Sequence, residues 1–159
     1  MRNRVLFEDF SPSSNLTIHF IMDQLTKHKV KVSTRTYINL VGLSSVFDYP
    51  VGFFDGASTT CMGGVGVHII LSNDHYFLLK IGRGQSTNTR SELLALWVLL
   101  VFSKHIGLPY LHIRGVSSAI INWFNGMATL ETLDLVGWCT EIMTLRSYFI
   151  HLESAHVFR

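Results

Sequence analysis

The sequence is poor in charged residues, in cysteine and in proline. Charged residues make up only 15% of the 159 residues, and the formal net charge is +2 at pH 7. This balance lacks the basic excess that accompanies strong, purely electrostatic binding of nucleic acid. The two cysteines, Cys61 and Cys139, are too few for a disulfide framework or a zinc site, so we expect a reducing compartment.

Long apolar runs are also missing, although hydrophobic residues make up 48% of the chain. The apolar run at 93–102 is too short for a membrane span, which needs about 20 such residues. The first residues include Arg2 and Arg4 but no apolar segment of signal-peptide length. We therefore expect a folded, intracellular protein of the nucleus or cytoplasm with no membrane partner.

The hydrophobic pattern changes near residue 50. Residues 1–49 show no sustained period, and we expect a poorly defined extension there, with one helix lined by Leu16, Ile18, Ile21 and Leu25. From residue 50 onward, short apolar segments between turn residues predict strands, and longer ones predict helices. The predicted strands are 51–55, 63–71, 75–82, 110–114 and 148–152, and the predicted helices are 88–105, 119–125 and 132–145.

The order of these elements predicts the topology of the sheet. The short connection between 63–71 and 75–82 predicts an antiparallel hairpin. A strand, a long helix and a further strand predict a right-handed crossover, with 111–114 parallel to 51–55. Glycines 63, 64 and 66 are expected to allow close approach of neighbouring groups. The expected fold class is α/β: a mixed five-stranded sheet with helices on its faces, formed by residues 50–159 as one domain.

Two acidic residues stand where the predicted elements can bring them together. Asp55 ends the first predicted strand, and Glu92 lies in the first turn of the helix 88–105. Thr87 or Asn88 can cap that helix by accepting a hydrogen bond from a first-turn N–H group. Glu92 alone is also explained as a favourable charge at the positive end of the helix dipole. Together with Asp55, it predicts a site for a divalent metal ion, Mg²⁺ or Mn²⁺.

Four segments carry a more specific signal: residues 54–58, 88–96, 115–117 and 156–159. In this order and spacing they resemble the successive blocks of the ribonuclease H-like domain. The similarity covers residues 50–159 and is greatest to the reverse-transcriptase-associated form of plant retroelements. It implies a five-stranded sheet with helices on its faces, and metal-dependent cleavage of RNA in RNA–DNA hybrids.

The resemblance also implies roles for single residues. Asp55 and Glu92 match the first two metal-binding acids of the family. His156 matches a histidine thought to assist proton transfer or product release, and a structural role at a strand end is the alternative for it. The positions that match contacts to the hybrid substrate are Gly56, Asn88, Thr89 and Ser117.

Two departures from the family pattern predict impaired catalysis. Where the family has Gly-Asp-Ser, this sequence has Gly115-Val116-Ser117, so an isopropyl group replaces a metal-binding carboxylate. The family's final helix, which carries the fourth acid, is expected to be missing because the sequence stops at Arg159. Two carboxylates bind one hydrated Mg²⁺ or Mn²⁺ ion weakly, whereas a two-metal clamp needs more ligands.

Three interpretations therefore remain open from the sequence. The first is a ribonuclease H-type nuclease acting on RNA–DNA hybrid as a monomer, with its activity reduced. The second is a non-catalytic nucleic-acid-binding or interaction module, which Val116 and the missing acid favour. The third is a retroelement remnant, which the irregular residues 1–49 favour. With two of four expected acids absent, the sequence does not decide whether the protein is an enzyme.

Overall fold

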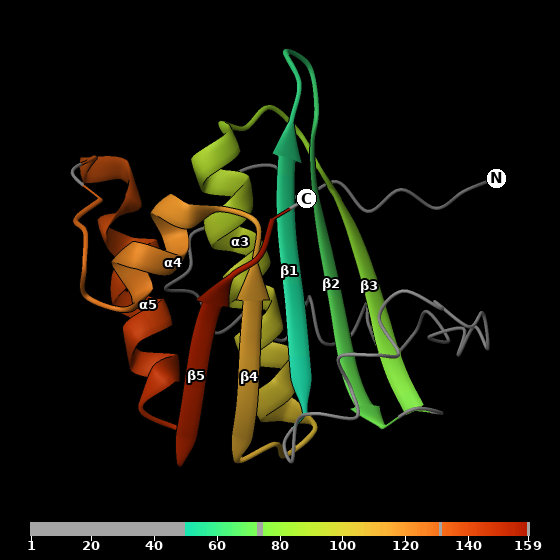
Figure 1. Cartoon of the computed structure of the whole chain (residues 1–159). Coiled ribbons are helices and arrows are strands. Elements are labelled where there is room, and N and C mark those ends of the chain that lie inside the picture. Colours follow the sequence, from blue (N-terminus) through green and yellow to red (C-terminus); the bar gives the residue numbers. More distant parts are fainter. Residues whose placement is uncertain (1–49, 73–74, 131, 159) are drawn as a thin grey trace, which may run out of the picture.

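The computed structural model describes residues 50–72, 75–130 and 132–158, which form a mixed five-stranded sheet with helices packed against it (Figure 1). The strands are β1 (Val51–Ser58), β2 (Gly63–Ser72), β3 (His75–Arg83), β4 (Tyr110–Gly115) and β5 (His151–His156). The helices are α3 (Asn88–His105), α4 (Ser118–Phe124) and α5 (Val136–Arg146), with the 3₁₀ helix η1 (Leu133–Leu135) before α5. The extension and helix expected within 1–49 lie outside the described residues.

The sheet has the strand order β3-β2-β1-β4-β5, so β1 is its central strand. β1 pairs antiparallel with β2, and β2 pairs antiparallel with β3, which confirms the predicted hairpin. On its other side β1 pairs in parallel with β4, and β4 pairs in parallel with β5. The predicted mixed sheet and the parallel crossover are both confirmed.

The helix α3 is buried on all sides, as its uninterrupted apolar run predicts. Residues 93–103 are each at most 6% exposed. β1 and β2 cover one side of α3 and α5 covers another, where Trp97 meets Trp138 edge to face at 5.7 Å between ring centroids. Thr87 caps the helix by accepting a hydrogen bond from the Arg90 amide at 3.2 Å, as one of the two predicted caps.

The α-helices all lie on one face of the sheet (Figure 1). Gly52 and Gly56 of β1 face α3, because a methyl group built on either would meet atoms of that helix. Side chains alternate along a strand, so Phe53 and Asp55 lie on the opposite face. None of the helices within the described residues has the length and apolar character needed to cross a membrane.

The predicted position of the last strand is wrong. β5 runs from His151 to His156, not over 148–152. After α5 the chain continues to turn, since the Tyr148 and Phe149 amides donate to carbonyl groups three residues earlier, at 3.1 and 3.2 Å. Phe149 is only 8% exposed and fills the core from this turn, whereas Ile150 is 75% exposed. Residues 148–150 of the predicted strand therefore form the turn after α5, and only 151–152 belong to β5.

Two predictions about β1 and β2 also need correction. β1 does not end at Asp55, because its next residues continue to pair with β2 as far as Ser58. Close approach holds at Gly63, where a methyl group would lie 3.0 Å from the Ser91 hydroxyl. Close approach is not found at Gly64 and Gly66. A methyl group added there would lie 3.8 and 3.9 Å from the nearest backbone oxygen, which is ordinary van der Waals contact.

Candidate functional site at the carboxyl end of β1 and β4

A direct backbone contact joins β1 to the first turn of α3 at Gly56. A methyl group built on Gly56 would lie 2.2 Å from the carbonyl carbon of Ser91 and 2.3 Å from the amide nitrogen of Glu92. Because these are backbone atoms, only glycine allows the strand and the helix to come this close. Asp55 is the residue before Gly56, and Glu92 is itself part of the contact. Both candidate acids therefore lie at or next to the point where β1 meets α3.

The first residue of α3 is also tied to β1. The Asn88 carbonyl oxygen, Oδ1, accepts hydrogen bonds from the Ser58 amide at 2.9 Å and from the Ser58 hydroxyl at 2.8 Å. Thr89, the other residue of this turn expected to contact substrate, is partly exposed. The start of α3 is therefore fixed to the end of β1 at two places, Gly56 and Ser58.

Val116 directly follows β4, which ends at Gly115. In the parallel register Phe54 pairs with Gly115, and Asp55 follows Phe54 in β1. That Val116 lies beside Asp55 stays a prediction. Ser117, which follows, is the N-cap of α4 and accepts a hydrogen bond from the Ile120 amide at 3.4 Å.

His156 contacts the backbone of Val116 and not the face that carries Asp55. Its Nε2 atom lies 3.0 Å from the Val116 carbonyl oxygen. Its ring meets Phe158 edge to face at 4.7 Å between centroids. Alternation along β5 places its side chain on the same face as Ser154, which contacts α4, whereas Asp55 faces the other way. A catalytic role for His156 stays a prediction.

The donors available for a metal ion are few. Within residues 50–72, 75–130 and 132–158, no group of three or more His, Cys, Asp or Glu side chains is arranged to hold one. Asp55 and Glu92 supply carboxylate oxygens, which are the ligands that Mg²⁺ prefers. This donor set suits one hydrated ion rather than a pair of ions. That the two carboxyl groups share an ion stays a prediction.

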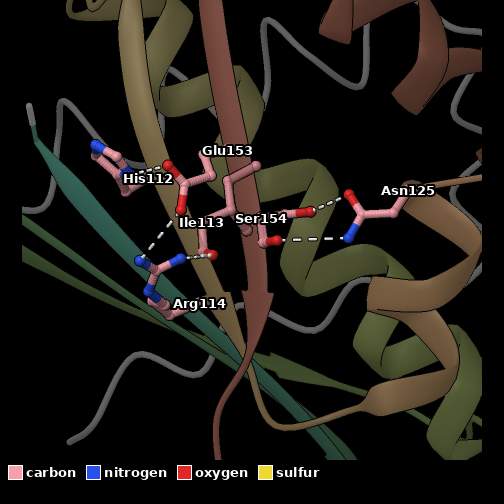
Figure 2. Close-up of polar contacts among 6 residues, drawn as sticks. All are labelled: His112, Ile113, Arg114, Asn125, Glu153 and Ser154. Carbon is pink, nitrogen blue, oxygen red and sulfur yellow. Dashed lines mark hydrogen bonds and ion pairs between the residues drawn. The ribbon is translucent and has the colours of Figure 1, made fainter.

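Sequence reasoning missed a charge cluster on the face of the sheet that carries Asp55. Glu153 of β5 lies 3.3 Å from Nδ1 of His112 and 3.7 Å from Nη2 of Arg114, both on β4 (Figure 2). Burial lowers the pKa of His112, and the Glu153 carboxylate opposes part of that shift. Glu153 is distant in the sequence from His112 and Arg114, so only the β4–β5 register reveals the cluster.

A second polar contact fixes α4 to β5. The Ser154 hydroxyl donates to Oδ1 of Asn125 at 2.6 Å, and the Asn125 amide nitrogen donates to the Ser154 carbonyl at 3.4 Å (Figure 2). Asn125 is the C-cap of α4, and Gly126 after it has φ of 74°. The sequence signals the helix end at these two residues, but not the partner strand. Glu153 and Ser154 thus point to opposite faces of β5.

Comparison with known proteins rests on structure. No protein-family model matches the chain, and no curated protein matches it. The N-terminal ribonuclease H domain of a Mycobacterium tuberculosis protein, solved as a fusion with maltose-binding protein, superposes with a TM-score of 0.63 at 19% identity, over 69% of this chain and 82% of that one. Ribonuclease H1 of Halobacterium salinarum gives a TM-score of 0.58 at 26% identity, over 69% and 86% of the two chains.

This chain has the ribonuclease H-like fold. A further structure with this fold, LC11 ribonuclease H1 in complex with an RNA/DNA hybrid, superposes with a TM-score of 0.64 at 19% identity, over 69% of this chain and 86% of that one. The fold predicted from the ordered sequence blocks is therefore confirmed. These similarities establish the fold, and the association with plant retroelements stays a prediction.

Proposed function

We propose that this ribonuclease H-like domain binds RNA–DNA hybrids at the carboxyl end of β1 and β4, and that its cleavage of the RNA strand is impaired. The observation that carries the proposal is the contact at Gly56, which joins the strand of Asp55 to the helix turn of Glu92. One structural neighbour, LC11 ribonuclease H1, was solved with a hybrid bound, which supports the choice of ligand.

The chemistry at this site would rest on Asp55 and Glu92. Both carboxylates would hold one Mg²⁺ or Mn²⁺ ion, which when bound stabilises negative charge on a phosphodiester. Val116 offers no ligand in the place where the family pattern has a carboxylate. Because about 1.4 kcal/mol corresponds to a tenfold change in rate, losing ligands worth several kcal/mol would remove most of the catalysis.

Binding of the hybrid would involve the residues that surround the acids. By resemblance to the family, we propose Gly56, Asn88, Thr89 and Ser117 as the positions that contact the hybrid. Gly56 packs against the first turn of α3, in which Thr89 is partly exposed. The proposed role of His156 is proton transfer. Its contact with the Val116 carbonyl group supports a second, structural role, in which His156 fixes the backbone after β4.

A second candidate function is a non-catalytic module that binds nucleic acid. The specific observation in its favour is Val116, an apolar residue directly after β4, where the family pattern has a carboxylate. In this case hybrid binding persists in chelator and no cleavage follows on adding a divalent ion. A retroelement remnant would instead show neither binding nor cleavage.

A labelled RNA–DNA hybrid distinguishes these functions. We expect the parent chain to bind hybrid more tightly than duplex DNA of the same sequence, and to cleave it slowly in Mn²⁺ or Mg²⁺. Asp55→Asn and Glu92→Gln should abolish that cleavage while the fold persists. Failure to bind hybrid would refute the proposal, and rapid cleavage by the parent would refute the impairment. Binding without any cleavage would establish the second candidate.

A further inference from the structure

The start of α3 contacts β1 at two points, and the distance between these points is similar along the strand and along the helix. Ser58, the last residue of β1, donates twice to Asn88, the first residue of α3. Gly56 touches the peptide between Ser91 and Glu92. Two residues of strand span about 6.8 Å, and three to four residues of helix span about 4.5–6 Å. The two contacts therefore fix how far α3 can slide along β1.

This register decides where Glu92 lies. A shift of α3 by one residue moves each side chain about 1.5 Å along the axis and turns it by about 100°. Such a shift would carry Glu92 away from the strand that bears Asp55. The Gly56 contact resists closer approach but not sliding, since it is a packing contact. The hydrogen bonds between Ser58 and Asn88 are directional and resist sliding.

We propose that Asn88 and Ser58 are positioning residues that set the spacing of Asp55 and Glu92, and through it the affinity for a divalent cation. The inference rests on the proposed function, in which these two acids hold the ion. The Asn88 carbonyl oxygen has two lone pairs, and the amide and hydroxyl of Ser58 both donate to it. A contact between Asn88 and the hybrid would accordingly use the NH₂ end of its side chain.

The test measures, by calorimetry, the Mn²⁺ affinity of the full chain and of variants at the start of α3 and the end of β1. Asn88→Ala removes both hydrogen bonds and should weaken Mn²⁺ binding on the order of tenfold, the usual effect of losing a residue that orients a ligand. Ser58→Ala removes only the hydroxyl bond and should have a smaller effect in the same direction. Ser58→Thr keeps the hydroxyl and should restore the affinity that Ser58→Ala loses.

Thr87→Ala is the control, because Thr87 caps the same helix through the Arg90 amide but makes no hydrogen bond to β1 among the described residues. It should lower the melting temperature and leave Mn²⁺ affinity unchanged. If Thr87→Ala and Asn88→Ala weaken Mn²⁺ binding equally, the effect comes from helix stability alone and the inference is overturned. Unchanged Mn²⁺ affinity in Asn88→Ala would overturn it as well. If the parent itself binds no Mn²⁺, the proposed cation site fails, and with it the positioning role of Asn88 and Ser58.

Discussion

Among substitutions at the candidate site, Gly56→Ala is expected to lower the stability of the fold most. The added methyl group would lie 2.2 Å from the Ser91 carbonyl carbon, and ordinary contact begins at 3.4 Å, so β1 and α3 must separate by about 1.2 Å. Overpacking costs about 1–3 kcal/mol. Because backbone opposes the methyl group and no side chain can rotate away, we expect about 3 kcal/mol or more here. For a chain of this length that corresponds to a drop of about 6–12 °C in melting temperature.

Two other glycines provide graded controls in the same thermal unfolding assay. At Gly66 the nearest atom is 3.9 Å from the added methyl group, so Gly66→Ala should change stability by less than about 0.5 kcal/mol. At Gly115 the methyl group would meet the Phe54 ring at 2.4 Å, and a ring can shift, so Gly115→Ala should fall between the two. Equal melting temperatures for Gly56→Ala and Gly66→Ala would refute the close contact of β1 with α3.

Two further predictions concern the core and the pH response. Trp138→Ala should destabilise the fold by about 3–5 kcal/mol in urea unfolding, because Trp138 is 3% exposed and packs edge to face on Trp97, whereas Trp138→Phe keeps a ring contact and should cost much less. Burial lowers the pKa of His112 and of His68, so the folded chain binds fewer protons than the unfolded one. Stability should therefore fall as the pH drops below about 6.5 toward these lowered pKa values. Urea midpoints across that range should show a shallower fall in His112→Phe than in the parent, and an unchanged slope would argue against this role for His112.

Much of the fold could be predicted because its strongest signals are local. The run at 93–102 is apolar on every side and follows the cap Thr87, so the sequence predicts a buried helix. The difference between the predicted last strand, 148–152, and the observed β5, His151–His156, shows the limit of such signals. Phe149 is apolar because it fills the core from a turn, while the strand itself carries the polar Glu153 that faces His112 and Arg114.

The candidate site was predictable only in part, because its geometry depends on contacts between distant residues. The sequence identifies Asp55 and Glu92 as acids, and resemblance to a family pairs them. Nothing local indicates that Gly56 packs on the peptide before Glu92, or that Asn88 accepts two bonds from a serine 30 residues away. These contacts follow from the register of α3 on β1, which no single segment encodes.

The most direct test of the central claim, a ribonuclease H-like site that lacks the carboxylate at position 116, is the Mn²⁺ dependence of stability in Val116→Asp. In chelator the new carboxylate should repel Asp55 and Glu92, so the variant should melt below the parent. Mn²⁺ at a hundredfold excess over its dissociation constant should stabilise the folded variant by about 2.7 kcal/mol, and binding should be tighter than in the parent. Equal Mn²⁺ affinity in parent and variant, or no stabilisation of the variant by Mn²⁺, would contradict the account.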